Sequence, residues 1–544
     1  MAPGEARARR TQPASHRCDA AIARMVEPNA GIVQGRDTNL EHEHYRMTAP
    51  IPVRVRLERI AAALVLASGC GGDGSSPTKP SDPSALSLTI AAGDAQQGTK
   101  GFALPESLRV RVAVPDGSPA SNVSVSFSAT AGVLNPVSVV TDVNGFAAAQ
   151  WIVNSASAGA TASITPSKSV TFTARAADPV ACTLGPGNGA YNEAPTDYST
   201  FVKPDGNVKA IMLLADFSDL PATETPDAAA SAFLPEASDF FTETSYGRMH
   251  LDVTVLRRWL RMPSPAAQYA YNPRSGGDPC LFVRDAIAAA DPDVDFSQFS
   301  LVYFVPALGA DIFTVALSPL NVTVISADAT RLRHLTILGR DFRFPGDDPN
   351  TARYGMAHET SHQFGLPDLY AAVPTTSSFE FVGFWDVMSL HTTGAHYTAW
   401  QKQKLGWLRP DEMVCIAGGG LEATLQPIET AGGLKSVALR LSPTRAIVAE
   451  VRRHIGRDAG IGEEGVLVYS VDASVASGAG PIRVLPSTTV VDPGTQGQLG
   501  PLYNATFGLV AGKSHHFEDA AAGVTIDVVA EEAPSFRIRI KKRP

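Results

Sequence analysis

Residues 358–368, HETSHQFGLPD, hold the densest group of candidate metal ligands in the sequence. His358 and His362 stand four residues apart, so on an α-helix both side chains leave the same face, roughly 6 Å apart along the axis. Two imidazoles in this arrangement can reach one ion. Zinc in catalytic sites usually takes three protein ligands and leaves one position to water. Glu359, next to the first histidine, is placed to accept a proton from that water.

The ends of this helix can also be predicted. It should begin near Asn350 or Thr351, after a capping Asp-Asp-Pro sequence. Gly365 can take the left-handed conformation that ends a helix, and Pro367 prevents the helix from resuming. The turn would carry Asp368 toward the histidines as a third zinc ligand. The alternative is a polar surface helix with incidental histidines. A chance match is infrequent, because the glycine and the aspartate must also stand at fixed positions after the second histidine.

The sequence before the motif predicts the domain that positions it. Nearly continuous apolar runs at residues 208–217 and 301–305 are typical of strands buried on both faces. Apolar residues at helical spacing predict helices over residues 228–244 and 280–290. Strands that alternate with helices predict an α/β (α+β) domain, which we assign to residues 178–410.

Residues 85–177 have a different pattern. Apolar and polar side chains alternate at 108–114, 123–127 and 170–173, which predicts half-buried strands of a small antiparallel β-sandwich. The sequence TDVNGFA at 141–147, followed by a tryptophan, resembles the bacterial Ig-like domains of invasin-type surface proteins. Such a domain could serve adhesion or substrate engagement, or act as a spacer. No catalytic group of residues occurs in it. We favour the spacer, because an Ig-like fold by itself constrains function only weakly.

The N-terminal region predicts export. Residues 47–70 combine arginines, a short apolar run and small residues before Cys70, as in a lipoprotein signal peptide. Cys70 is therefore expected to be the lipidated mature N-terminus, anchored at the bacterial cell envelope or surface, from which the protein could also be released. Residues 1–46 would then reflect a start codon placed too early, and the Gly/Ser-rich residues 71–84 would form a flexible linker.

Residues 411–544 return to alternating patterns with Gly and Pro turns, which predict a C-terminal β-sandwich. Glu450 and Asp472 in this region are candidate ligands for Ca²⁺, although scattered acidic residues are more often only solvated. The strands are expected at residues 437–441, 446–452, 465–469 and 536–540.

Composition limits the class of partner. The chain has 544 residues, a hydrophobic fraction of 44% and a formal net charge of −9 without a basic patch. This length predicts several domains, and the charge disfavours binding to nucleic acid. We expect protein or peptide substrates, contact with the membrane through the lipid anchor, and a monomer.

The combined motif resembles a known family. The pattern H-E-x-x-H-x-x-G-x-x-D, followed by W-D-V-M-S at residues 385–389, is similar to the immune inhibitor A family of bacterial secreted metallopeptidases, relatives of the metzincins. The resemblance implies that His358, His362 and Asp368 hold Zn²⁺, that Glu359 is the general base, and that Met388 forms a packing floor, the Met-turn. It leaves the group that stabilises the oxyanion open, with four candidates: Tyr370, His391, His396 and Tyr397.

The cysteines can be assigned in more than one way. Cys182, Cys280 and Cys415 follow the proposed lipidation site, and the sequence does not choose a disulfide pair among them. Cys182 could instead ligate the zinc in a latent form, although a disulfide or simple burial is favoured.

The sequence thus predicts an exported, lipid-anchored zinc endopeptidase. Two hypotheses from different functional classes remain beside it. One is a surface adhesion lipoprotein whose protease-like domain is catalytically silent. The second is a structural lipoprotein whose metal only stabilises the fold, although a structural zinc usually has four protein ligands and no adjacent base.

Overall fold

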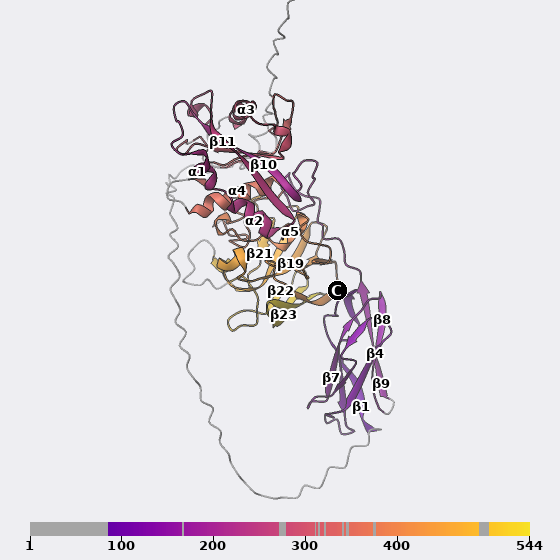
Figure 1. The fold of residues 1–544 in the computed structure, drawn as a ribbon. Coiled ribbons are helices and arrows are strands. Elements are labelled where there is room, and N and C mark those ends of the chain that lie inside the picture. The colour runs from indigo at the N-terminus through magenta and orange to yellow at the C-terminus, as the bar shows by residue number, and fades with distance from the viewer. Residues whose placement is uncertain are drawn as a thin grey trace, which may run out of the picture.

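The computed structural model describes residues 85–165, 168–270, 279–310, 312–313, 316–319, 322–339, 342–343, 348–373, 377–488 and 500–543. The predictions for residues 1–46, the signal peptide 47–70 with Cys70, and the linker 71–84 fall outside these ranges. The described chain consists mostly of strands with few helices, in several regions (Figure 1), as the sequence predicted. Within it, no helix is both long and apolar enough to cross a membrane.

The first region is a two-sheet β-sandwich with a core of its own, formed around Trp151 and Phe172. One sheet has the order β1-β3-β7-β5 and the other β2-β9-β8-β4-β6. Side chains alternate between buried and exposed along β3, so the period of two in the sequence corresponds to one face on the core. The strands are β1 (Ser87–Ala92), β2 (Gln96–Thr99), β3 (Leu108–Ala113), β4 (Ser124–Ala129), β5 (Val133–Asn135), β6 (Ser138–Val140), β7 (Phe146–Ile152), β8 (Ser157–Ile164) and β9 (Lys168–Ala177).

The second region contains a four-stranded parallel sheet of order β11-β10-β12-β15. A two-stranded antiparallel pair, β13-β14, belongs to the same region. The elements are β10 (Gly206–Asp216), α1 (Pro226–Ser231), α2 (Glu236–Thr244), β11 (Met249–Arg261), α3 (Pro279–Ala290), β12 (Leu301–Pro306), β13 (Val324–Ile325), β14 (Arg331–Leu332), β15 (Leu335–Ile337), α4 (Pro349–Gln363) and α5 (Ala399–Lys404).

Strand β10 is buried on both faces, which explains its continuous apolar sequence. Met212 and Leu214 point into the core that contains α2 and α4, whereas Ile211 and Leu213 point into the core that contains α3. Successive side chains of a strand leave opposite faces, so one strand supplies both cores. The sheet is therefore the middle of three layers, and α4 lies on one of its faces.

The single helix predicted over residues 228–244 is wrong in one respect, because the structure divides it into α1 and α2. The break falls at residues 232–235. Pro235 lacks an amide hydrogen and disfavours helical backbone in the residue before it, so the apolar periodicity continues while the helix does not.

The third region is a second β-sandwich, with sheets of order β16-β18-β19-β20-β21 and β17-β24-β23-β22. Apolar residues from both sheets, among them Val468 and Ile538, share one core. The strands are β16 (Met413–Ile416), β17 (Gly420–Leu425), β18 (Ser436–Arg440), β19 (Arg445–Arg452), β20 (Gly465–Asp472), β21 (Ile482–Val484), β22 (His516–Asp519), β23 (Val524–Glu532) and β24 (Ser535–Lys542).

The C-terminal sandwich lies between the other two regions (Figure 1). Toward the N-terminal sandwich, the amide of Glu422 donates to the carbonyl of Ala103, and the hydroxyl of Thr99 donates to the carbonyl of Gly420. Toward the parallel-sheet region the contact is more extensive, because residues of β19 and β20 belong to the same apolar core as α2 and α4. The second and third regions therefore pack as one body.

Cys182 forms a disulfide with Cys415. The bond ties the segment that follows β9 to strand β16, and the amide of Val180 also donates to the carbonyl of Cys415. This pairing answers the question that the sequence left open for these two cysteines. It also excludes Cys182 as a metal ligand in this state, because its sulfur is already bonded.

Candidate metal centre

Helix α4 carries both histidines of the motif and has defined ends. At its start, the side chain of Asp348 accepts a hydrogen bond from the amide of Asn350, and Pro349 occupies the first helical turn. On the sheet side, the hydroxyls of Tyr303 in β12 and Thr360 lie 2.8 Å apart in a buried hydrogen bond. These contacts fix the axial position of α4 over the sheet, and with it the height of the histidines.

The C-terminal end of α4 forms a Schellman turn. The amide of Gly365, whose φ is +87°, donates to the carbonyl of His362, and the amide of Leu366 donates to the carbonyl of Ser361. The turn reverses the chain direction as the sequence predicted, and it brings Asp368 back to the histidines.

Three side-chain atoms converge at this point. Nε2 of His358 and Nε2 of His362 each lie 3.2 Å from Oδ1 of Asp368. Ligand atoms at 2.0–2.1 Å from a tetrahedral zinc are about 3.3 Å apart, so the observed spacing matches a zinc coordination shell. Two imidazole nitrogens and one carboxylate oxygen are also the donor set of a catalytic zinc site, with one position left over.

The other nitrogen of each imidazole has a backbone partner. Nδ1 of His358 lies 3.0 Å from the carbonyl oxygen of Val387, and Nδ1 of His362 lies 2.8 Å from the carbonyl oxygen of Leu366. A carbonyl only accepts hydrogen bonds, so each Nδ1 carries a proton. In the neutral imidazole the lone pair is then on Nε2, the nitrogen that lies next to Asp368. Both rings therefore have the tautomer that a metal ion requires.

The carboxylates of Glu359 and Asp368 favour a positive charge at this position. Burial disfavours the charged form of His362, but Asp368 and Glu359 outweigh burial and raise the pKa of His362 to about 9. Burial likewise disfavours ionised Asp368, yet the two histidines hold the pKa of its carboxyl well below the usual range. A divalent ion bound here would replace a proton as the counter-charge of the carboxylates.

Glu359 lies within the same group, because its carboxylate and the two imidazoles offer ligand atoms within 4.8 Å of one another. The hydroxyl of Ser318 lies 2.9 Å from Oε2 of Glu359 and 2.9 Å from its backbone carbonyl. A serine hydroxyl donates to one acceptor at a time, and either hydrogen bond restrains Glu359. The second carboxylate oxygen can then act on a water molecule or a substrate.

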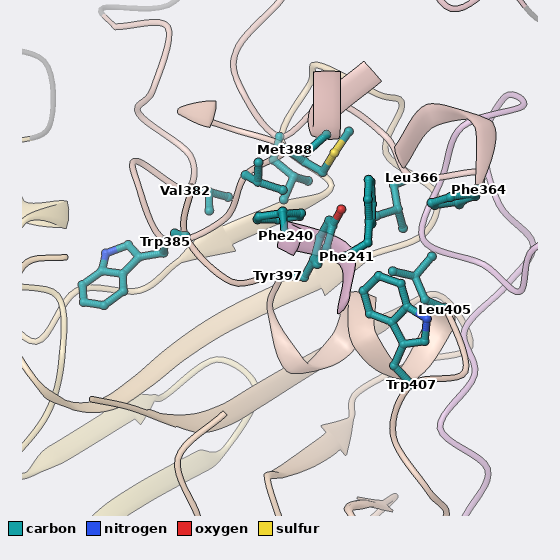
Figure 2. Close-up of a cluster of buried hydrophobic side chains, with 14 of the residues drawn as sticks. Phe240, Phe241, Phe364, Leu366, Val382, Trp385, Met388, Tyr397, Leu405 and Trp407 are labelled. Carbon is teal, nitrogen blue, oxygen red and sulfur yellow. The ribbon is translucent and has the colours of Figure 1, made fainter. Parts of the chain in front are cut away.

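Residues 385–389 lie against the motif, where the Met-turn was predicted. Met388 is fully buried and belongs to the apolar cluster of Phe240, Phe241 and Tyr397 (Figure 2). The carbonyl of Met388 accepts a hydrogen bond from the amide of Leu369. The turn thus holds the residue after Asp368 as well as His358, whose Nδ1 it binds through the carbonyl of residue 387.

The four candidates for the oxyanion donor fall into two pairs. The ring of Tyr370 stacks on His358 with 6.0 Å between centroids, and the ring of His391 lies 5.9 Å from the same histidine. Tyr397, by contrast, bonds the hydroxyl of Ser361 beneath α4 and is fully buried. His396 is also fully buried, and its Nδ1 lies 2.8 Å from Nζ of Lys402. Of the four candidates, the structure therefore places Tyr370 and His391 beside a motif histidine.

Three residues of the site have no motif that could reveal them. Ser318 binds Glu359, as described above, and Ser477 binds Asp368 from the loop between β20 and β21. The ring of Tyr191 lies 5.1 Å from that of His362, and its hydroxyl donates to the carbonyl of Ser318. Burial, with the nearby Glu359 and Asp368, raises the pKa of Tyr191 well above its usual value, so its hydroxyl remains a donor.

The two carboxylates considered for calcium do not come together. Glu450 lies opposite Leu467 in the β19–β20 pair, whereas Asp472 lies opposite Arg445, about 17 Å further along the strands. Glu450 is fully buried, and both of its oxygens accept hydrogen bonds from other residues of the protein. These two residues therefore do not form one calcium site.

Comparison with known proteins gives only distant structural similarities. No protein-family model matches the chain, and no curated protein matches it. Among solved structures it is similar to the D0-D1 domain of intimin, with 22% identity, a TM-score of 0.13, and coverage of 16% of this chain and 43% of that one. Invasin, a bacterial integrin-binding protein, gives 20% identity, a TM-score of 0.15, and coverage of 18% and 21%. A Bacteroides ovatus GH5 xyloglucanase gives 12% identity, a TM-score of 0.13, and coverage of 40% and 45%.

The chain therefore spans less than half the length of each of these proteins. Similarity at this level assigns neither an activity nor a partner. The intimin and invasin structures are distant Ig-like neighbours at low coverage, and with TM-scores of 0.13 and 0.15 they carry no argument about this chain. No match supports the resemblance to the immune inhibitor A family, which rests on the sequence motifs alone.

Proposed function

We propose that this protein is a zinc-dependent endopeptidase with a metzincin-like catalytic domain. The observation that carries the proposal is the convergence of His358, His362 and Asp368, with Nε2 to Oδ1 distances of 3.2 Å on both sides. A metal that only stabilises a fold usually has four protein ligands, whereas this site offers three ligands and a carboxylate beside them. That combination supports hydrolysis over a structural role.

When bound, zinc acts as a Lewis acid that polarises a carbonyl and makes a water molecule acidic near neutral pH. The residues of the chain then have separate roles. The carbonyls of Val387 and Leu366 orient the imidazoles. Glu359, held by Ser318, takes the proton of the attacking water and returns it to the nitrogen of the leaving amine. The side chains near enough to be tested as donors to the oxyanion are Tyr370, His391 and Tyr191.

Glu359→Gln tests the proposal. The variant keeps all three ligands but loses the base, so we expect one zinc per chain, as in the wild type, and proteolysis reduced by about 10²–10⁴-fold. Zinc content and cleavage of casein are measured on the same preparations, with Glu106→Gln on the exposed surface of the Ig-like sandwich as the control. Equal activity in the Glu359 variant would remove this residue from the mechanism.

The same measurements separate the alternatives. Zinc bound to an inactive wild-type protein would favour the structural metal, and a wild type that holds no zinc would favour a silent protease-like domain in an adhesion protein. Cleavage that stops with a chelator and returns with added zinc supports the peptidase.

We further propose that the protein is exported and anchored by lipid at Cys70, where it would meet extracellular or periplasmic protein substrates. The support is the sequence of residues 47–70. Mass spectrometry of the protein extracted from membranes tests this, with a diacylated Cys70 as the expected N-terminus. A mature N-terminus upstream of Cys70 would contradict it.

A further inference from the structure

The loop between β20 and β21, residues 473–481, reaches Asp368 from a distant part of the sequence. The hydroxyl of Ser477 accepts a hydrogen bond from the amide of Asp368 at 2.9 Å and donates to its Oδ2 at 3.2 Å. The amide of Gly478 donates to the carbonyl of Asp368 at 3.0 Å, and the amide of Ala372 donates to the carbonyl of Gly478 at 2.8 Å. The loop therefore binds the amide, the carbonyl and one carboxylate oxygen of Asp368.

The approach is close enough to require glycine. Gly478 has a φ of +71°, and a Cβ added to it would lie 2.5 Å from the Cβ of Ala372. A side chain at this position would push the loop off the segment that carries Asp368. The contact is thus a tight fit between two particular segments.

Asp368 depends on such a contact more than the histidines do. His358 and His362 are fixed by α4, whereas Asp368 follows the helix and its side chain is 23% exposed. Its Oδ1 faces the imidazoles while its Oδ2 binds Ser477, so the serine selects the rotation of the carboxylate that presents Oδ1.

We propose that Ser477 is a positioning residue for the third metal ligand, and that the C-terminal sandwich thereby completes the metal centre. This inference rests on the proposed zinc site. It assigns the C-terminal region a part in metal binding that packing alone would not give it.

The test compares Ser477→Thr with Ser477→Val in the full chain. The two side chains have the same shape, but only threonine keeps the hydroxyl. We expect the valine variant to bind zinc about 10–100-fold more weakly, as is typical when a partner of a metal ligand is lost, and threonine to restore most of the affinity. Zinc affinity is measured by competition with a chromophoric chelator, and the visible spectrum of the Co²⁺-substituted protein reports the geometry of the ligands.

Ser474→Ala is the matched control, because this serine lies in the same loop but bonds Asp472. We expect it to bind zinc as the wild type does. Equal zinc affinity and equal Co²⁺ spectra for the threonine and valine variants would overturn the inference about Ser477. The proposed function would still stand in that case, provided that the wild type binds zinc and cleaves protein. If the wild type binds zinc but is inactive, the proposed function fails while the comparison of threonine with valine still decides the role of Ser477.

Discussion

The position of one proton on each imidazole decides whether the motif can bind a metal. At His358 and His362 Nδ1–H donates a hydrogen bond to a backbone carbonyl, so in the neutral imidazole Nε2 is the nitrogen that can bind an ion. At Asp368 a serine holds one oxygen and leaves the other toward the histidines. Each ligand thus has a partner that fixes its orientation before any metal arrives, which lowers the cost of ordering the site on binding.

Glu359, the proposed general base, has a comparable partner in Ser318, and Ser318→Ala tests the importance of that contact. Without the hydroxyl, the carboxylate of Glu359 loses the contact at Oε2 and can rotate away from the water. We expect kcat to fall about 10-fold with little change in KM or in zinc content, because ligands and substrate contacts remain. Steady-state kinetics on a peptide substrate measures this, and Ser318→Thr should recover activity. An increase in KM with unchanged kcat would show that Ser318 acts on substrate binding instead.

At the scale of elements, the end of α4 decides where the third ligand goes. The helix stops at Gln363, and the left-handed backbone at Gly365 turns the chain. A Cβ at Gly365 would lie 2.9 Å from Cγ2 of Thr196, so the turn is also packed against another segment. Helix, turn and neighbouring segment together determine the distance from His362 to Asp368.

Gly365→Ala is expected to disturb both stability and metal binding. Left-handed backbone costs an alanine about 1–2 kcal/mol, and the contact with Thr196 adds to this cost. Gly406→Ala is the matched control, because Gly406 also has a positive φ, +78°, but its Cβ would meet no atom within 4 Å. Urea unfolding and zinc affinity should show the larger loss for Gly365→Ala. Equal losses in the two variants would mean that the contact with Thr196 is unimportant.

At the scale of the whole molecule, the C-terminal sandwich supports the parallel-sheet region through buried charges. Arg452 of β19 is fully buried, and it donates to Glu450, to Asp458 and to the carbonyl of Trp385 in the Met-turn. Charges so far from water are stable only when each has a partner, so removal of one partner is costly. The Met-turn and Asp368 therefore both depend on residues far along the chain.

Lys402 in α5 belongs to the same network and predicts a dependence on pH. Burial lowers the pKa of Lys402 to about 7, and the nearby Arg452 contributes. The unfolded chain keeps this lysine protonated up to about pH 10.4, so unfolding takes up a proton between these values. The contribution of Lys402 to stability should therefore increase from pH 7 to pH 10, by at most about 1.4 kcal/mol per pH unit.

The measurement is the difference in the free energy of unfolding between wild type and Lys402→Met across this pH range. We expect the free energy of unfolding of the wild type to increase relative to that of Lys402→Met as pH rises. Lys168→Met, at an exposed lysine, is the control, and its free energy of unfolding should change with pH as that of the wild type does. Parallel curves for Lys402→Met as well would contradict a neutral, buried Lys402.

The sequence alone determined the local features of this protein. The spacing of His358, Glu359 and His362 predicted their common position on a helix, and that helix begins at Pro349, within two residues of the predicted start. Continuous and alternating apolar patterns predicted β10, β12 and part of each sandwich, because side-chain periodicity depends only on neighbours in the chain. The predicted sandwich strands are β3, β4, β9, β18, β19, β20 and β24. The interruption at Pro235 was the exception, since apolar spacing concealed it.

Only the tertiary structure decided which distant residues complete the site. Ser477 lies more than a hundred positions from Asp368, and Tyr191 lies still further from His362. Tyr397 and Tyr370 were equal candidates in the sequence, but packing put the first beneath the helix and the second beside His358. The physical reason is that hydrogen bonds across a core depend on how whole elements pack, and local periodicity carries no record of that packing.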